Sequence, residues 1–331
     1  MGGHVHGCAA CGTSRFAYHS CNHRACPQCG AQATARWVQR ELGKRVGAPY
    51  FMVTFTVPQE LRVLFFGGAA KQVYDAMFAA ASGALASTLS HPRWLGAAHH
   101  GFTMILHTWN QRLLFHPHLH AIVPGAGLDR RGRVVRVKNP GFLVPQPVLR
   151  KKFRRFFRQQ LEHLRQHTDL PPVDPAVWHK DWGVHLQPFG DGAHAIKYLG
   201  AYVNRTAISD ARLLAVQDQR VTFSWKDRAR GNARRTETVT GTEFVARYLR
   251  HVLPLGLRAI RRYGFCHPSA KATRERIAWH TGCTIVLETT PATPAPRPAC
   301  PCCGAPMIAQ MRLPAFWNTG RAPPAAPSLA A

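Results

Sequence analysis

The chain has 331 residues, 46% of them hydrophobic, and it carries 43 Lys and Arg against 16 Asp and Glu, a formal net charge of +27. This length and hydrophobic content exclude a wholly disordered chain, and the charge makes nucleic acid the first candidate partner, ahead of an anionic membrane surface. A GC-rich genome, in which Arg replaces Lys, would explain part of the arginine count, but it would not explain the shortage of acids.

No targeting or membrane segment is predicted. The N-terminus lacks the charged and apolar regions of a secretory signal, and the most apolar helical stretch, residues 69–89, is interrupted by Lys71 and Asp75. We therefore expect a cytoplasmic protein, whose ten cysteines are then thiolate ligands rather than disulfides.

The cysteines lie only near the two ends of the chain. This distribution predicts a metal module over residues 1–47, a globular body over residues 48–265 and a C-terminal appendage over residues 266–331. The appendage contains a cysteine pair and a Pro/Ala-rich tail that we expect to be disordered.

The N-terminal cysteines have the spacing of a zinc site. Two C-x2-C pairs, separated by fourteen residues, suit tetrahedral Zn²⁺ held by four thiolates. The expected structural zinc ligands are Cys8, Cys11, Cys26 and Cys29, and the alternative or additional ligands are His19, Cys21 and His23.

A third C-x2-C pair occurs near the C-terminus, at Cys300 and Cys303. No further pair follows at comparable spacing, so the sequence leaves open whether zinc binds there. Cys266 and Cys283 are candidates to complete such a site, and the role of Cys302 is not predicted.

The central residues alternate between strand-like and helix-like stretches. β-Branched and aromatic runs predict strands, apolar residues at helical spacing predict helices, and Gly and Asp mark turns. In chain order we expect a strand at 50–58, a helix at 69–89, strands at 101–110 and 113–123, a turn into a strand after 124, helices at 146–167 and 192–205, a hairpin around 221–241, and one or two helices within 241–263. This order predicts an α+β fold with helices packed on an antiparallel sheet.

Histidines alternate in the strand-like run "LLFHPHLHAIVPG". Alternate side chains of a strand share a face, so His118 and His120 would lie side by side and could hold one divalent ion. His116 shares that face, but Pro117 can distort the strand between it and the pair. The alternative is a polar strand face exposed to solvent.

Two tyrosines, Tyr198 and Tyr202, lie four residues apart on the predicted helix 192–205. Such a pair usually packs into a core. Here Lys197 and Arg205 flank it, and a tyrosine hydroxyl can attack a phosphodiester when a metal polarises the phosphate. We interpret the tyrosines as nucleophiles and the two cations as DNA contacts.

Carboxylates are too few and too scattered for the metal sites of two-metal nucleases. A single ion held by histidines therefore fits better. The third ligand is unassigned, and the candidates are Gln187, His194 and Asn204.

The helix at 146–167 is strongly basic. We expect its cations to contact DNA phosphates and its phenylalanines, Phe153, Phe156 and Phe157, to pack into the core. The cations are Lys151, Lys152, Arg154, Arg155 and Arg158.

These motifs, in this order, resemble the IS91 family of rolling-circle transposases. The resemblance covers residues from about 2 to about 265 and includes "SCNHRACPQC", "FMVTFTVPQELR", "FHPHLHAIVPGAGL", "YLGAYVNRTAIS" and "VTFSWKD". It implies that His118-Leu119-His120 is the HUH triplet and that Tyr198 and Tyr202 are the catalytic pair. It further implies a five-stranded antiparallel HUH-nuclease sheet with flanking helices, preceded by a zinc-binding module.

The resemblance also implies the chemistry. Single-stranded DNA would be cut at the ends of an insertion sequence, with Mg²⁺ or Mn²⁺ as the cofactor. The products would be a 5′-phosphotyrosine link and a free 3′-hydroxyl. The protein would act on DNA of the bacterial nucleoid. Tyr198 would make the first attack and Tyr202 would serve a second strand transfer. The alternatives are a plasmid-type rolling-circle replication initiator and a non-catalytic DNA-binding relic. Family members usually carry a further stretch before the cysteines, so we expect a shortened N-terminus.

Overall fold

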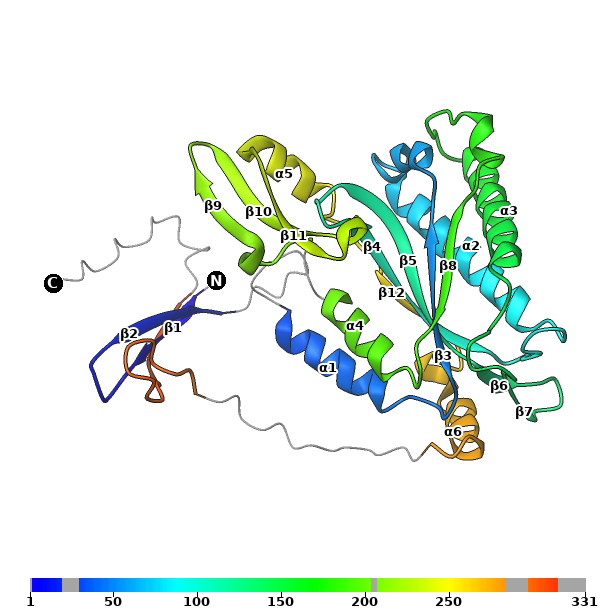
Figure 1. Cartoon of the computed structure of the whole chain (residues 1–331), viewed down its shortest axis with the longest axis horizontal. Coiled ribbons are helices and arrows are strands. Elements are labelled where there is room, and N and C mark those ends of the chain that lie inside the picture. Colours follow the sequence, from blue (N-terminus) through cyan, green and yellow to red (C-terminus); the bar gives the residue numbers. More distant parts are fainter. Residues whose placement is uncertain (1, 20–29, 204–206, 284–296, 315–331) are drawn as a thin grey trace. The chain divides into compact units, whose positions relative to one another are not determined.

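The computed structural model describes residues 2–19, 30–203, 207–283 and 297–314, and the chain forms two compact units (Figure 1). One comprises residues 1–29 and 288–331, and the other comprises residues 30–287. This division differs from the expected boundaries after residues 47 and 265. Helix α1 (Ala31–Leu42) packs against α4 (Ala193–Val203) within the larger unit, whereas the C-terminal segment pairs with the N-terminus.

The smaller unit contains a three-stranded antiparallel sheet of order β13-β1-β2. Its strands are β1 (Gly3–Gly7), β2 (Ser14–Tyr18) and β13 (Ile308–Leu313). Strand β13 pairs with β1 from Gly3 opposite Leu313 to Gly7 opposite Ile308. Residues that the sequence analysis assigned to a separate appendage therefore form one edge of the N-terminal sheet.

The larger unit is built on a five-stranded antiparallel sheet of order β12-β4-β5-β3-β8, which confirms the predicted α+β fold (Figure 1). Its strands are β3 (Tyr50–Thr56), β4 (Gly101–Trp109), β5 (Phe115–Pro124), β8 (Gly183–Pro188) and β12 (Ile260–Gly264). Strand β5, which carries the alternating histidines, is the central strand of the sheet.

The two edge strands were not predicted. Residues 260–263 were expected to be helical, but they pair with β4 and form β12. Strand β8 pairs with β3 from Gly183 to Pro188. Both segments are short, and ladder hydrogen bonds to a neighbouring strand hold them in place, an interaction between residues far apart in the sequence.

One face of the sheet packs against helices α2 (Ala70–Leu89) and α3 (Gln146–Arg165) (Figure 1). Leu119 of β5 belongs to this core together with Phe153 and Phe157 of α3, which are fully buried. The phenylalanines of the basic helix therefore pack inward, as predicted. The short helix η1 (Gln59–Phe65) lies beside them and contacts α2.

The opposite face packs against α1, α4 and α6 (Lys271–His280). Its apolar part contains Ile122 of β5, Trp37 of α1 and Ile196 of α4. The histidines of β5 alternate with Leu119, and they therefore lie on this second face.

A second three-stranded sheet, of order β11-β10-β9, lies at the turn between β4 and β5. Leu113 of that turn is packed in one cluster with Phe223 and Val239. The strands are β9 (Leu213–Gln217), β10 (Arg220–Asp227) and β11 (Ala233–Thr240), followed by α5 (Gly241–Leu249). This sheet contains the predicted hairpin.

The remaining elements are short. A hairpin joins β6 (Ala126–Leu128) and β7 (Val134–Arg136). The 3₁₀ turns are η2 (Pro175–Trp178), η3 (Asp210–Arg212), η4 (Arg228–Arg230) and η5 (Pro268–Ala270). None of the helices in the described part of the chain is long and apolar enough to cross a membrane.

Candidate active site and cysteine cluster

The two predicted metal-binding histidines lie together on the central strand. His118 and His120 share one face of β5, and their ring centroids are 4.8 Å apart. Leu119 between them is fully buried in the opposite core. Period-two alternation thus places both imidazoles on the face that α4 partly covers.

A third histidine, which the sequence analysis missed, completes the group. His107 of β4 pairs in register with His118. One ligand atom from each of His107, His118 and His120 lies within 4.8 Å of the others. The sequence indicated only that His107 shares a face of its predicted strand with Ile105 and Trp109. The register between β4 and β5 is what brings His107 opposite His118.

The three imidazoles are neutral at neutral pH, as metal ligation requires. Burial lowers the pKa of His118 to about 4 and that of His120 to about 3. Burial and the two neighbouring imidazoles hold the pKa of His107 well below its ordinary value.

Hydrogen bonds orient the two imidazoles of β5. Nδ1 of His118 lies 2.6 Å from the carbonyl oxygen of His116, which can only accept, so Nδ1 donates and Nε2 is left with its lone pair for a metal. Nδ1 of His120 lies 3.0 Å from Oγ1 of Thr54 on the neighbouring strand. A ligand whose second nitrogen is held in this way keeps its ring orientation.

The histidines line an open cleft with a volume of about 640 Å³. The cleft is also lined by polar residues of β3 and β8, by Tyr198 of α4, and by residues of the β4–β5 turn and of β10. His116 lies at the same cleft, and Nη2 of Arg62 is 2.8 Å from its Nδ1. His116 is therefore held by Arg62 and lies outside the group of three.

Tyr198 reaches the cleft because of its position on α4. Ala195, Ile196 and Leu199 of this helix are buried against the sheet, whereas the Tyr198 side chain is 37% exposed and lines the cleft with the three histidines. The Tyr198 side chain is therefore accessible from the cleft. Tyr202 is one helical turn further along α4, and its side chain lies outside the described residues.

The three residues that the sequence analysis proposed for the third metal ligand lie in different places. Gln187 of β8 lines the cleft, His194 is exposed and is not among the residues lining it, and Asn204 lies outside the described residues. The position beside His118 and His120 is occupied by His107 instead.

A basic and aromatic wall on the other side of the cleft was not predicted as part of the site. Trp225, Lys226 and Arg228 of the β10 segment line the cleft, and the Arg112 guanidinium lies 5.6 Å from the ring centroid of Trp225. Glu237 of β11 fixes Arg112 through two hydrogen bonds of 2.8 and 3.0 Å. Cations beside an aromatic ring that lines an open cleft are typical of a surface for single-stranded nucleic acid.

We expect Trp225→Ala to weaken binding of single-stranded DNA about 5- to 150-fold, because stacking of one base on an aromatic ring contributes about 1–3 kcal/mol. Fluorescence anisotropy at fixed salt measures the effect. The slope of affinity against salt should not change, since phosphate contacts remain. Trp279→Ala is the matched control, because Trp279 is 83% exposed on α6 and is not among the residues lining the cleft. Equal affinity in both variants would contradict this role.

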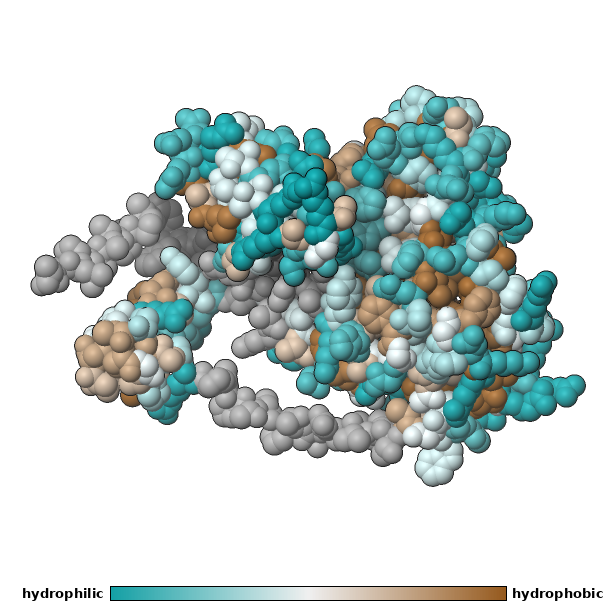
Figure 2. Space-filling model, viewed as in Figure 1, coloured by the Kyte–Doolittle hydropathy of each residue, from teal (hydrophilic) through white to brown (hydrophobic). Residues whose placement is uncertain are grey.

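The predicted DNA contacts of the basic helix lie elsewhere. Helix α3 packs on the sheet face opposite the histidines, and hydrophilic residues cover much of it in Figure 2. Several of its cations have local partners, among them Lys152 with Ser87, Arg154 with the carbonyl of Lys180, and Arg158 with Glu162. DNA contact by Lys151, Lys152, Arg154, Arg155 and Arg158 stays a prediction, and it would require a strand that continues around the sheet.

Two cations flank the tyrosines in the sequence. Lys197 is exposed on α4, and Arg205 lies outside the described residues. Their contact with DNA also stays a prediction.

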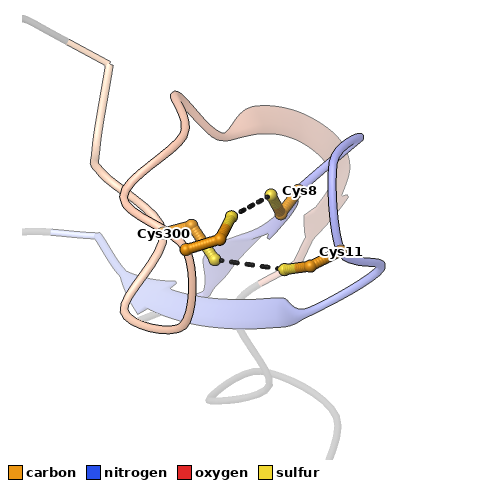
Figure 3. Close-up of side chains that lie close together, drawn as sticks. Cys8, Cys11 and Cys300 are labelled. Carbon is orange, nitrogen blue, oxygen red and sulfur yellow. Dashed lines mark hydrogen bonds between the residues drawn. The ribbon is translucent and has the colours of Figure 1, made fainter.

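Four cysteines of the smaller unit gather in one cluster (Figure 3). Cys8 and Cys11 lie with Cys300 and Cys303, and none of the described cysteines is in a disulfide. The predicted partners Cys26 and Cys29 lie outside the described residues, as do Cys21 and His23. His19 contacts His4, with 2.9 Å between their ring nitrogens.

Comparisons with known proteins match both units. The family Y2_Tnp, described as "Putative transposase", matches residues 101–274, and the "Transposase zinc-binding domain" family Zn_Tnp_IS91 matches residues 1–57. The chain is 37% identical over 281 residues to "Putative transposase y4qJ" of Sinorhizobium fredii, covering 80% of this chain and 70% of that protein.

A second relative is the transposase for insertion sequence element IS801 of Pseudomonas savastanoi pv. phaseolicola. It is 29% identical over 272 residues, covering 77% of this chain and 63% of that protein. Among solved structures, TrwC complexed with a 27-mer DNA that comprises its recognition hairpin and cleavage site aligns at 9% identity with a TM-score of 0.28, covering 71% of this chain and 74% of that chain.

Proposed function

Because this chain belongs to the IS91 family of rolling-circle transposases, we propose that its cleft nicks and joins single-stranded DNA at insertion-sequence ends through a tyrosine nucleophile. One observation carries the proposal: Tyr198 and the three neutral histidines line the same open cleft, beside a wall of cations and a tryptophan.

The proposed reaction is a transesterification at phosphorus. The Tyr198 Oη attacks the scissile phosphate and loses its proton to solvent or to a nearby base, while the bond between phosphorus and the 3′-oxygen breaks and that oxygen takes up a proton. The products are a 5′-phosphotyrosine and a free 3′-hydroxyl. In joining, a 3′-hydroxyl attacks the phosphotyrosine and the same bonds exchange in reverse. Tyr202 would serve the second strand.

His107, His118 and His120 would hold a divalent cation. The fit is supported by their neutral rings, by the oriented Nε2 of His118 and by ligand atoms within 4.8 Å of one another. Three ligands on one side of an ion leave open positions, so a bound Mg²⁺ or Mn²⁺ would polarise the scissile phosphate and offset its developing charge.

The protein residues around this centre bind and orient the strand. Arg112, Lys226 and Arg228 line the cleft and would neutralise backbone phosphates on either side of the scissile one. Trp225 would stack a base and so fix the register of the strand relative to Tyr198. The protein would act in the cytoplasm, on chromosomal or plasmid DNA.

A denaturing gel tests the proposal. Purified protein is incubated with labelled single-stranded oligonucleotides tiled across the ends of the insertion sequence, with Mn²⁺, with Mg²⁺ or with EDTA. We expect the 3′-side fragment to be linked to the protein through its 5′-phosphate and the 5′-side fragment to end in a free 3′-hydroxyl, and both products should be absent with EDTA. If the protein binds these oligonucleotides but forms an adduct with none of them, it is a non-catalytic DNA-binding relic instead.

A further inference from the structure

We propose that Cys8, Cys11, Cys300 and Cys303 hold one zinc ion, so that the two ends of the chain together build a single zinc site. The family match for a zinc-binding domain ends at residue 57 and does not include the C-terminal pair. The inference is independent of the DNA chemistry proposed above, since it rests on the smaller unit alone.

The two cysteine pairs form the same turn. The sequences CAACG (8–12) and CPCCG (300–304) both end in a glycine with left-handed backbone, with φ of 73° at Gly12 and 75° at Gly304. This conformation is accessible to glycine at little cost.

The backbone hydrogen bonds of the two turns are also equivalent. The amide of Cys8 donates to the carbonyl of Thr13 at 2.9 Å, and that of Gly12 donates to Cys8 at 3.0 Å. In the second turn Cys300 donates to Ala305 at 2.8 Å, and Gly304 donates to Cys300 at 2.9 Å. Two such turns that face each other are typical of the knuckles in a four-cysteine zinc site.

The sulfur positions suit a tetrahedral ion and not a disulfide. Sγ of Cys8 lies 3.5 Å from that of Cys303, and Sγ of Cys11 lies 3.5 Å from that of Cys300 (Figure 3). All four sulfurs are within 4.8 Å of one another. Four thiolates about 2.3 Å from a zinc ion are about 3.8 Å apart, whereas a disulfide bond is about 2.0 Å long.

The unit around the cluster needs such a ligand. Its buried core, among the described residues, consists of Cys8, Cys300 and Met307, with Ala305 packed against them. So small an apolar core contributes little to folding, and zinc bound by four cysteines supplies free energy that a small core does not. The ion would also fix the pairing of β1 with β13, whose residues lie at opposite ends of the chain.

Thiol protection in the unmodified full-length protein tests the site without any variant that might fail to fold. Cys302 and Cys303 are adjacent, and both are exposed. Brief treatment of the zinc-loaded protein with iodoacetamide, followed by peptide mass spectrometry, should label Cys302 but leave Cys303, Cys300, Cys8 and Cys11 unlabelled. After chelation, all five should be labelled. Rapid labelling of Cys300 and Cys303 in the loaded protein would overturn the proposal.

Metal content gives a second, independent readout. We expect C300S/C303S to lose one zinc per chain and, after cobalt substitution, to lose the absorption of a tetrahedral four-thiolate site. C302S is the matched control and should keep both. The pair C26S/C29S addresses the competing ligand set: if it abolishes the cobalt spectrum while C300S/C303S leaves it intact, the site uses Cys26 and Cys29 and the proposal is wrong.

Discussion

Replacing Tyr198 with phenylalanine leaves DNA binding intact and lowers formation of the covalent adduct by at least about 1,000-fold, the scale of loss when a nucleophile is removed. The phenylalanine keeps the aromatic ring, whose centroid lies 6.4 Å from that of Phe189, and removes only the attacking oxygen. Adduct yield on a denaturing gel and affinity by anisotropy are measured on the same oligonucleotide.

Two further variants interpret the outcome. Tyr18→Phe is the matched control, since Tyr18 is 69% exposed but belongs to the smaller unit. If Tyr198→Phe keeps its adduct and Y198F/Y202F does not, the first attack belongs to Tyr202. An adduct that survives in the double variant would contradict a tyrosine nucleophile on α4.

Replacing His107 with glutamine is expected to weaken Mn²⁺ binding at least 10-fold and to raise the Mn²⁺ concentration needed for half-maximal cleavage by a similar factor. His107 of β4 is only 4% exposed, so glutamine is chosen to fill its space. Isothermal titration calorimetry gives the affinity and the gel gives the activity. High Mn²⁺ should restore part of the cleavage, because a lost ligand is a loss of affinity.

His185→Gln is the control for His107. His185 also lines the cleft, on β8, but it is not one of the three clustered histidines. Its replacement should leave Mn²⁺ affinity within about twofold. If His107→Gln binds Mn²⁺ as the wild type does, while His118→Ala does not, the site has two histidine ligands and His107 is only a packing residue.

The same group predicts a preference between metals. Mg²⁺ binds oxygen ligands and loses its hydration water reluctantly, whereas Mn²⁺ accepts imidazole nitrogen more readily. We therefore expect more cleavage with Mn²⁺ than with Mg²⁺ at the same low metal concentration, measured as adduct yield on the denaturing gel.

Local patterns predicted much of the fold. Alternation in residues 113–123 placed His118 and His120 on one strand face, and the spacing of Tyr198 and Tyr202 placed both on one helix. The central strands, α2 and α3 also followed from patterns within single segments. The basic helix α3 shows the limit of this reasoning, because its charge was evident in the sequence but the sheet face on which it packs was not.

The sequence alone determined the motifs: which segments carry histidines, tyrosines and paired cysteines, and in what order. Only the tertiary structure decided which of them meet. His107 joins His118 through a strand register, Trp225 reaches the cleft because a second sheet packs at the β4–β5 turn, and Cys300 reaches Cys11 because β13 pairs with β1. The reason is physical: periodicity fixes the face of a residue within its own element, whereas contacts between distant elements depend on register and packing that no single segment encodes.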